Sequence, residues 1–311
     1  MQLSLVSISL ATVCVIGCLY GLFFVLFGAS LYTLILRQRS FSTQPNMQQA
    51  SSSLTLLILS SILIFMAITV HTIFVFVRLF QAFVWYKRGS APLEFYADLS
   101  QPTEVAKTFI MVTAVVIADA MIIYRLWIIW SYSIAIILFP IFTLFGAVAC
   151  GIGTTYQFTQ YKPGENISTS QAGHWIMSLF VATLCTNIYS TVCIAGRIIK
   201  INRGSIIYEG GSLMSVVAIV IESAAIFTAW SIFGITSLLS KSNLQFITAD
   251  LWSTISGISF MLINVRVGLG WAHSGKSQAM TQISLPELAG INPSQENTYS
   301  GGEDTMKNAF K

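Results

Sequence analysis

Charged residues are scarce in this sequence, and their scarcity excludes most classes of protein. Of 311 residues only 9% are Asp, Glu, Lys or Arg, whereas 55% are hydrophobic and the mean hydropathy is +0.74. A soluble domain carries about a quarter charged residues, and a disordered chain is more polar still. The formal net charge of +4 is too small to be the footprint of a nucleic-acid partner. The composition therefore indicates a multi-pass membrane protein.

Catalytic motifs and metal-ligand patterns are also missing. The three histidines, His71, His174 and His273, lie in separate regions and provide no metal-ligand spacing. All five cysteines fall in apolar segments, which leaves none for an extracellular disulfide. The sequence contains no nucleophile elbow and no glycine-rich phosphate loop. It therefore predicts neither an enzyme nor a cofactor or metal site.

Long uncharged runs are what the sequence does contain. A helix needs about 20 apolar residues to cross a bilayer, and continuous rather than alternating runs exclude a membrane barrel. We predict an all-α protein whose seven-helix transmembrane domain occupies residues 1–272. The first run has no basic residues before it and no cleavage site, so we expect a span rather than a signal peptide. The expected spans are 10–36, 54–77, 105–130, 134–157, 175–196, 213–239 and 248–271.

Basic residues near the ends of the spans predict the orientation. Nothing positive precedes the first span, whereas Arg37 and Arg39 follow it, which places the N-terminus outside. The acceptor triplet for N-glycosylation at Asn166 falls in a loop that this topology puts outside. The polar segment 273–311 then becomes a cytosolic tail, and its composition predicts disorder. We expect the plasma membrane as the location.

Polar residues inside the predicted spans are the candidate functional residues. Ionisable groups in a span are costly, and they mark either function or pairing between helices. At a rise of about 1.5 Å per residue, six such residues lie about 18 to 30 Å from the outer ends of their spans. This predicted buried polar layer consists of Asp119, Arg125, Asn187, Glu222, Asn264 and Arg266.

Two interpretations of the polar layer stay open. It is either an ion site, proton relay or conformational lock, or a set of structural pairs in which Glu222 compensates Arg266 or Arg125. A second pair, His71 and Arg78, lies seven residues apart and so shares one helix face near the outside. These two residues either line an outer cavity or hold the following loop.

Several segments together resemble a known group of proteins. They are Asp119, the run Tyr124–Trp130, Pro140, the run Ile221–Ala225 and the run Ile263–Gly270. The combination resembles a large group of uncharacterised seven-helix membrane proteins of mushroom-forming (basidiomycete) fungi. The resemblance implies a seven-helix fold and a fungal membrane protein without a known ligand.

Better-known seven-helix families do not fit these residues. The predicted seventh span, 248–271, has no lysine to hold retinal and no proline of the kind that rhodopsin-like receptors carry there. The leading hypothesis is a receptor-like protein that senses a small ligand from the outer side and has a cytosolic signalling partner. The alternative is a proton- or cation-coupled transporter or channel that uses the midplane carboxylates Asp119 and Glu222.

Overall fold

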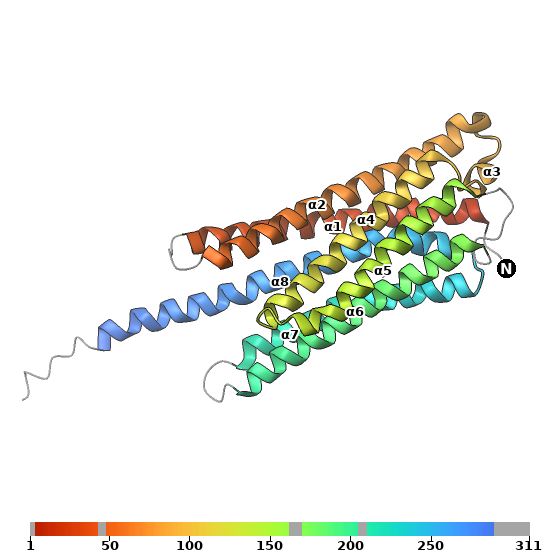
Figure 1. Ribbon diagram of the computed structural model, residues 1–311. Coiled ribbons are helices and arrows are strands. Elements are labelled where there is room, and N and C mark those ends of the chain that lie inside the picture. The colour runs from red at the N-terminus through yellow and green to blue at the C-terminus, as the bar shows by residue number, and fades with distance from the viewer. Residues whose placement is uncertain (1–3, 43–47, 162–169, 205–209, 289–311) are drawn as a thin grey trace, which may run out of the picture. The chain divides into compact units, whose positions relative to one another are not determined.

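The computed structural model is a bundle of long helices. It describes residues 4–42, 48–161, 170–204 and 210–288, and within these ranges it contains helices and no strands. The principal helices, coloured from red to blue in Figure 1, are α1 (Leu5–Ser42), α2 (Gln48–Phe80), α4 (Pro102–Ile129), α5 (Ile134–Thr159), α6 (Gln171–Gly204), α7 (Gly210–Leu239) and α8 (Leu244–Leu288).

Seven of the described helices are long and apolar enough to cross a membrane. The fold class predicted from the uncharged runs is therefore confirmed at the level of an all-helical, multi-pass membrane protein. The helices extend beyond several of the predicted spans, because the sequence limits were set at charges that the helices continue past. The spans in the structure are Leu5–Arg39, Ser53–Gly89, Pro102–Ile129, Ile134–Thr159, Gln171–Ile201, Val220–Leu239 and Leu244–Arg266.

Successive long helices run in opposite directions, so the loops collect at two ends of the bundle (Figure 1). The start of α1 lies at the end that also carries the connections α2–α4, α5–α6 and α7–α8. We call this the N-terminal end and the other the opposite end. The chain therefore passes from one end to the other seven times between Leu5 and Arg266.

α8 is the most buried helix of the bundle, and α4 and α6 follow it. In α8 every residue from 251 to 261 is buried, and 72% of its most apolar stretch is enclosed, against 17% for α1. Buried clusters join α8 to α1, α2, α4, α6 and α7. In α4 and in α6, half of the corresponding stretch is buried, and α4 packs on α2, α5 and α6. Side chains from α4 and α8 therefore face the interior along the length of the bundle.

Small residues allow the other helices to approach α8 closely. A Cβ atom on Gly257 would lie 2.3 Å from Ile68 Cδ1 of α2 and 2.8 Å from Phe23 Cε2 of α1. Ser259 of α8 donates a hydrogen bond of 2.7 Å to the Ser223 carbonyl oxygen of α7. Packing and such polar bonds drive helix association in lipid, where the hydrophobic effect is absent.

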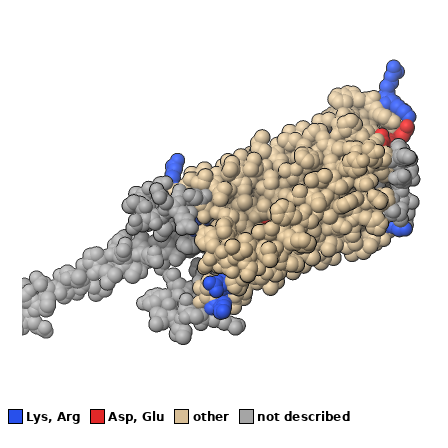
Figure 2. Space-filling view, in the orientation of Figure 1, with Lys and Arg blue, Asp and Glu red and all other residues tan. Residues whose placement is uncertain are grey.

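The outside of the bundle is apolar where a bilayer would surround it. Phe142 is 78% exposed and Phe145 is 70% exposed on α5. On the face shown in Figure 2, the blue and red charged side chains gather at the two ends, and the surface between them is almost free of charge. Large exposed apolar areas are rare on soluble monomers, so this surface suits hydrocarbon as its solvent.

The end of the chain differs from the predicted tail. The part of α8 from Gly270 onward belongs to a second unit, separate from the bundle. α8 continues to Leu288, so residues 273–288 are helical where the sequence predicted disorder. No proline interrupts residues 271–285, which removes the strongest local signal against a helix. The remaining tail residues and the predicted glycosylation site Asn166 lie outside the described residues.

Candidate functional site: a charged and aromatic pocket at the N-terminal end

Four charged side chains from three helices form a buried network near the N-terminal end. Arg78 Nε of α2 lies 2.9 Å from Glu104 Oε2 of α4. Lys107 Nζ, one turn along α4, lies 3.0 Å from Glu104 Oε1 and 2.7 Å from Asp250 Oδ1 of α8. The side chains of Arg78, Lys107 and Glu104 are 3%, 8% and 10% exposed. The network holds two cations and two carboxylates and is therefore neutral.

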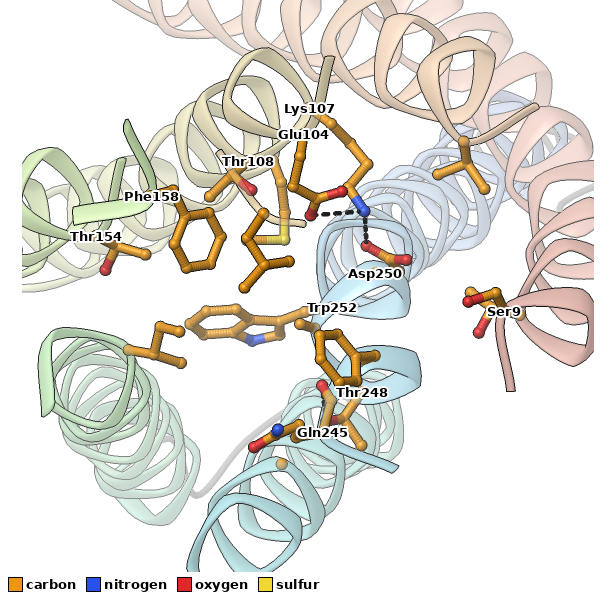
Figure 3. Close-up of a pocket in the computed structure, with 18 of the residues that line it drawn as sticks. Ser9, Glu104, Lys107, Thr108, Thr154, Phe158, Gln245, Thr248, Asp250 and Trp252 are labelled. Atoms are coloured by element: carbon orange, nitrogen blue, oxygen red, sulfur yellow. Dashed lines mark hydrogen bonds and ion pairs between the residues drawn. The ribbon is translucent and has the colours of Figure 1, made fainter. Parts of the chain in front are cut away.

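The backbone of α4 supports this arrangement. Pro102 begins the helix and Glu104 lies in its first turn, where the helix dipole favours a negative charge. Lys107 follows at i+3, so the two side chains share one face of the helix. Figure 3 shows the Lys107 ammonium between the Glu104 and Asp250 carboxylates. The spacing along α4 thus brings Lys107 to Glu104, and the packing of α8 against α4 brings Asp250 to the same ammonium.

Irregular structure after α2 covers the network. The helix passes into a π-helical turn, Gln81–Trp85, and then into the short turn Tyr86–Gly89. Gly89 has φ +76°, and a Cβ there would lie 2.2 Å from the Phe83 carbonyl oxygen, so the turn requires glycine. The short helix α3 (Pro92–Ala97) follows and sets Phe95 5.0 Å from the Arg78 guanidinium.

Tyr96 of α3 stands beside the same arginine. Its ring centre lies 6.0 Å from the Arg78 guanidinium carbon. Burial raises the pKa of the Tyr96 hydroxyl to about 12, an effect that the positive charge of Arg78 opposes. The hydroxyl therefore stays protonated at physiological pH and keeps its capacity to donate a hydrogen bond.

A cavity of about 90 Å³ lies against the ion network. That volume accommodates several water molecules or one small organic molecule. All seven long helices contribute to its wall. Polar or charged groups come from Ser9, Thr12, Arg78, Tyr96, Glu104, Lys107, Thr108, Thr154, Gln245, Thr248 and Asp250, and the main aromatic side chains are Phe158, Phe180, Phe246 and Trp252.

Stacked rings form one wall of the cavity. The Trp252 and Phe180 ring centres are 3.9 Å apart with their planes 17° from parallel. This close packing requires a glycine on α7, because a Cβ on Gly234 would lie 2.7 Å from Phe180 Cε1. Trp252 is only 1% exposed. A mostly apolar concave surface with a few placed polar groups is typical of a small-molecule site.

Two polar atoms of this wall lack hydrogen-bond partners. They are Nε1 of Trp252 and Oε1 of Gln245, both buried. Both side chains belong to α8 and are seven residues apart, so they lie on the same face of the helix. In Figure 3 the indole nitrogen is on the side of the ring that faces Gln245. By contrast, Trp230 Nε1 of α7 donates to the Thr248 carbonyl oxygen at 3.1 Å.

A second polar cluster lies toward the opposite end. The Arg125 guanidinium of α4 donates to Asn264 Oδ1 of α8, and Asn264 Nδ2 donates to Ser61 Oγ of α2 at 3.2 Å. The guanidinium carbon also lies 4.7 Å from the Phe260 ring centre. The structure therefore joins two residues of the predicted polar layer and links α2, α4 and α8 through them.

The rest of the predicted polar layer is divided. Asp119 is 3% exposed and Asn187 is 7% exposed, and each has one buried side-chain oxygen without a partner. The prediction that Glu222 and Arg266 are buried is wrong, because both side chains are exposed. Among the described residues no ion pair joins Glu222 to Arg266 or to Arg125. Depth along a helix could be counted from the sequence, but the face on which each residue lies could not.

The two predicted outer-cavity residues also separate. Arg78 lines the cavity, whereas His71 does not. His71 is completely buried two turns away on α2, and neither ring nitrogen has a hydrogen-bond partner. Sequence reasoning did not select Glu104, Lys107, Asp250, Gln245 or Trp252. The spacing of Glu104 and Lys107 on one helix face was the available signal.

The fold and the site define a class of protein. The chain is a multi-pass membrane protein of seven helices with a small charged and aromatic pocket at one end. Comparison with protein-family models, with curated proteins and with solved structures gives no match. Within the described ranges, no three His, Cys, Asp or Glu side chains come together as metal ligands.

Proposed function

We propose that this chain is a receptor-like seven-helix protein that binds a small molecule in the pocket at its N-terminal end. The observation that carries the proposal is the pocket itself, which gathers side chains from all seven long helices. A ligand there would contact every helix at once. Binding would therefore favour one arrangement of the helices over another, which is the requirement for a signal.

Two of the buried helices, α4 and α8, connect the pocket with the opposite end. α4 carries Lys107 in the pocket and Arg125 in the second cluster, and α8 carries Asp250 and Asn264 in the same two places. A shift of α8 against α4 at the pocket would alter the Arg125–Asn264 hydrogen bond. Small helix shifts of this kind are a common switching movement.

The proposed orientation and location depend on the charges near the spans. The arginines that follow the first span favour an N-terminal end that faces outward, and the opposite end would then meet a cytosolic signalling partner. We propose the plasma membrane as the location, since an N-terminal end that faces outward there meets molecules in the medium. Membership of the fungal seven-helix group remains a prediction from the motifs.

A cavity-filling variant tests the proposal. Thr108 of α4 is 4% exposed and lines the pocket, whereas Thr113 of the same helix does not. Purified wild type, Thr108→Leu and Thr113→Leu are screened by thermal unfolding against neutral, cationic and anionic small molecules. We expect at least one compound to raise the melting temperature of wild type and Thr113→Leu but not of Thr108→Leu. Compounds that stabilise all three proteins equally, or none, would refute the proposal.

Transport is a second candidate, and one observation favours it. Asp119 Oδ2 and Asn187 Oδ1 are buried in the interior without partners. Unpaired polar groups at such depth are typical of proton and ion pathways. The test is acidification of vesicles that contain the purified protein and an interior pH dye. Flux that Asp119→Asn abolishes and Thr108→Leu leaves unchanged would favour transport over reception.

A further inference from the structure

The unpartnered atoms of the pocket wall indicate the chemistry of its ligand. Trp252 Nε1 is a donor without an acceptor, and Gln245 Oε1 is an acceptor without a donor. Leaving such groups buried and unpaired is unfavourable. In water both would be satisfied, and inside a bundle they require a partner that enters the pocket. One hydroxyl group can accept from the indole N–H and donate to the amide oxygen.

The balanced charges of the pocket exclude ionic ligands. Arg78 and Lys107 are matched by Glu104 and Asp250, and three ion pairs of 2.7 to 3.0 Å join them. An ionic ligand would add an uncompensated charge beside this neutral network in a site of low dielectric constant. The network therefore favours an uncharged ligand, and among the neutral polar groups of the wall Trp252 and Gln245 carry buried atoms without partners.

The shape of the cavity limits the rest of the ligand. Its volume is about 90 Å³, and apolar and aromatic side chains dominate the wall around the polar groups. The Trp252–Phe180 stack presents flat carbon surface. A short hydrocarbon body fits such a wall, since dispersion and burial of apolar area stabilise it there.

We propose, on the basis of the proposed binding function, that the pocket takes a small neutral alcohol whose hydroxyl bridges Trp252 Nε1–H and Gln245 Oε1. The hydrocarbon part of the alcohol lies against the Trp252–Phe180 stack. The ion network contributes the neutral charged part of the wall and does not contact the hydroxyl.

The experiment uses 1-hexanol as the probe and the full chain in detergent. Hexylamine, hexanoic acid and 1-chlorohexane serve as cationic, anionic and non-donating probes of similar length. The seven tryptophans each give one indole N–H signal in a ¹H–¹⁵N spectrum, and Trp252→Phe identifies the signal of Trp252 by its loss. We expect 1-hexanol to shift that signal saturably and the other three probes to shift it only at concentrations at least about tenfold higher.

Matched variants separate the hydrogen bonds from packing. Gln245→Met removes the acceptor and keeps the length of the side chain, and Trp252→Phe removes the donor. Each variant should weaken 1-hexanol binding about tenfold, as measured by the change in melting temperature with probe concentration. Trp230→Phe is the control, because its indole donates to Thr248 and lies outside the pocket wall. It should bind 1-hexanol as wild type does.

Different failures identify different errors. Equal binding of 1-chlorohexane and 1-hexanol, tighter binding of either charged probe, or equal losses in Trp230→Phe and Trp252→Phe would overturn the hydroxyl assignment while leaving a ligand pocket. If no probe moves the Trp252 signal, the alcohol proposal is wrong. If in addition no library compound distinguishes Thr108→Leu from Thr113→Leu, the proposed binding function fails as well.

Discussion

Lys107 shows how strongly the surroundings of a residue determine what its charge contributes to the stability of the fold. Its ammonium lies between two carboxylates in the interior and is 8% exposed. Lys87 makes a similar contact with Glu94, yet these side chains are 52% and 58% exposed. Exposed pairs are screened by water and contribute little. Removing one partner from a buried network leaves an unpaired charge and is strongly destabilising.

This difference gives a prediction for two matched substitutions. Lys107→Met should lower the free energy of unfolding by about 3 kcal/mol, because Glu104 then keeps only Arg78 and Asp250 loses its ion-pair partner. Lys87→Met should leave the melting temperature almost unchanged. Thermal unfolding of both variants in the same detergent measures the effects. Equal losses of stability in the two variants would show that Lys107 is not paired as described.

At the scale of residues, the sequence gives the charge of a side chain and its depth along a span, but not the direction in which the side chain points. Arg78, Arg125 and Asn264 could be selected as polar groups inside spans, and they take part in interhelical bonds. Glu104, Lys107 and Asp250 lie near the ends of the predicted spans, and the sequence did not single them out. Their mutual contacts depend on how α8 packs against α4, which no local pattern encodes.

At the scale of elements, the close packing of α8 depends on residues without bulky side chains. Gly257 lies where α1 and α2 approach α8, and an added methyl would meet Ile68 and Phe23. Gly21 of α1 is a contrasting case, since nothing lies within 4 Å of a Cβ there. The sequence shows both as glycines in apolar runs, and only the packing distinguishes them.

Alanine at these two glycines should have opposite effects. Gly257→Ala should destabilise the bundle by about 1 to 3 kcal/mol through overpacking. Gly21→Ala should be neutral or stabilising by up to about 1 kcal/mol, because alanine favours the helix over glycine. Melting temperatures of the two purified variants give the comparison. A stable Gly257→Ala protein would mean that α8 does not approach α1 and α2 so closely.

The presence of each long helix was predictable, because it follows from the length of an uncharged apolar run alone. All seven long helices were expected from runs that exceed about 20 apolar residues. Their limits were less predictable, as the segment Leu5–Arg39 shows against the expected 10–36. Polar residues such as Ser7 and Gln38 continue a helix readily, and hydropathy does not mark where it stops.

On the scale of the whole molecule, seven crossings put the start of α1 and the residues after Arg266 on opposite sides of the membrane. If the N-terminal end faces outward, a glycan at Asn166 is allowed and the residues after Arg266 face the cytosol. The arginines and the glycosylation triplet are sequence signals, and the fold is compatible with either orientation.

Glycosylation mapping in expressing cells should establish the orientation. Endoglycosidase should reduce the apparent mass of the wild-type protein, and Asn166→Gln should abolish this change. Tyr299→Thr, made together with Asn166→Gln, completes a new acceptor triplet at Asn297 and should leave the protein unmodified. Modification at Asn297, or cleavage of the tail by protease added to intact cells, would reverse the assigned orientation.

The balanced charges of the pocket network have a consequence for a protein in an energised membrane. A transmembrane voltage acts on net charge that moves across it, with about 2.3 kcal/mol for each elementary charge and 100 mV. Arg78, Lys107, Glu104 and Asp250 together carry none. A movement that carries these four side chains as a group therefore generates no gating current, and occupancy of the pocket by an uncharged molecule is insensitive to membrane potential. Loss of Lys107 would leave one negative charge and create a voltage dependence that the native arrangement avoids.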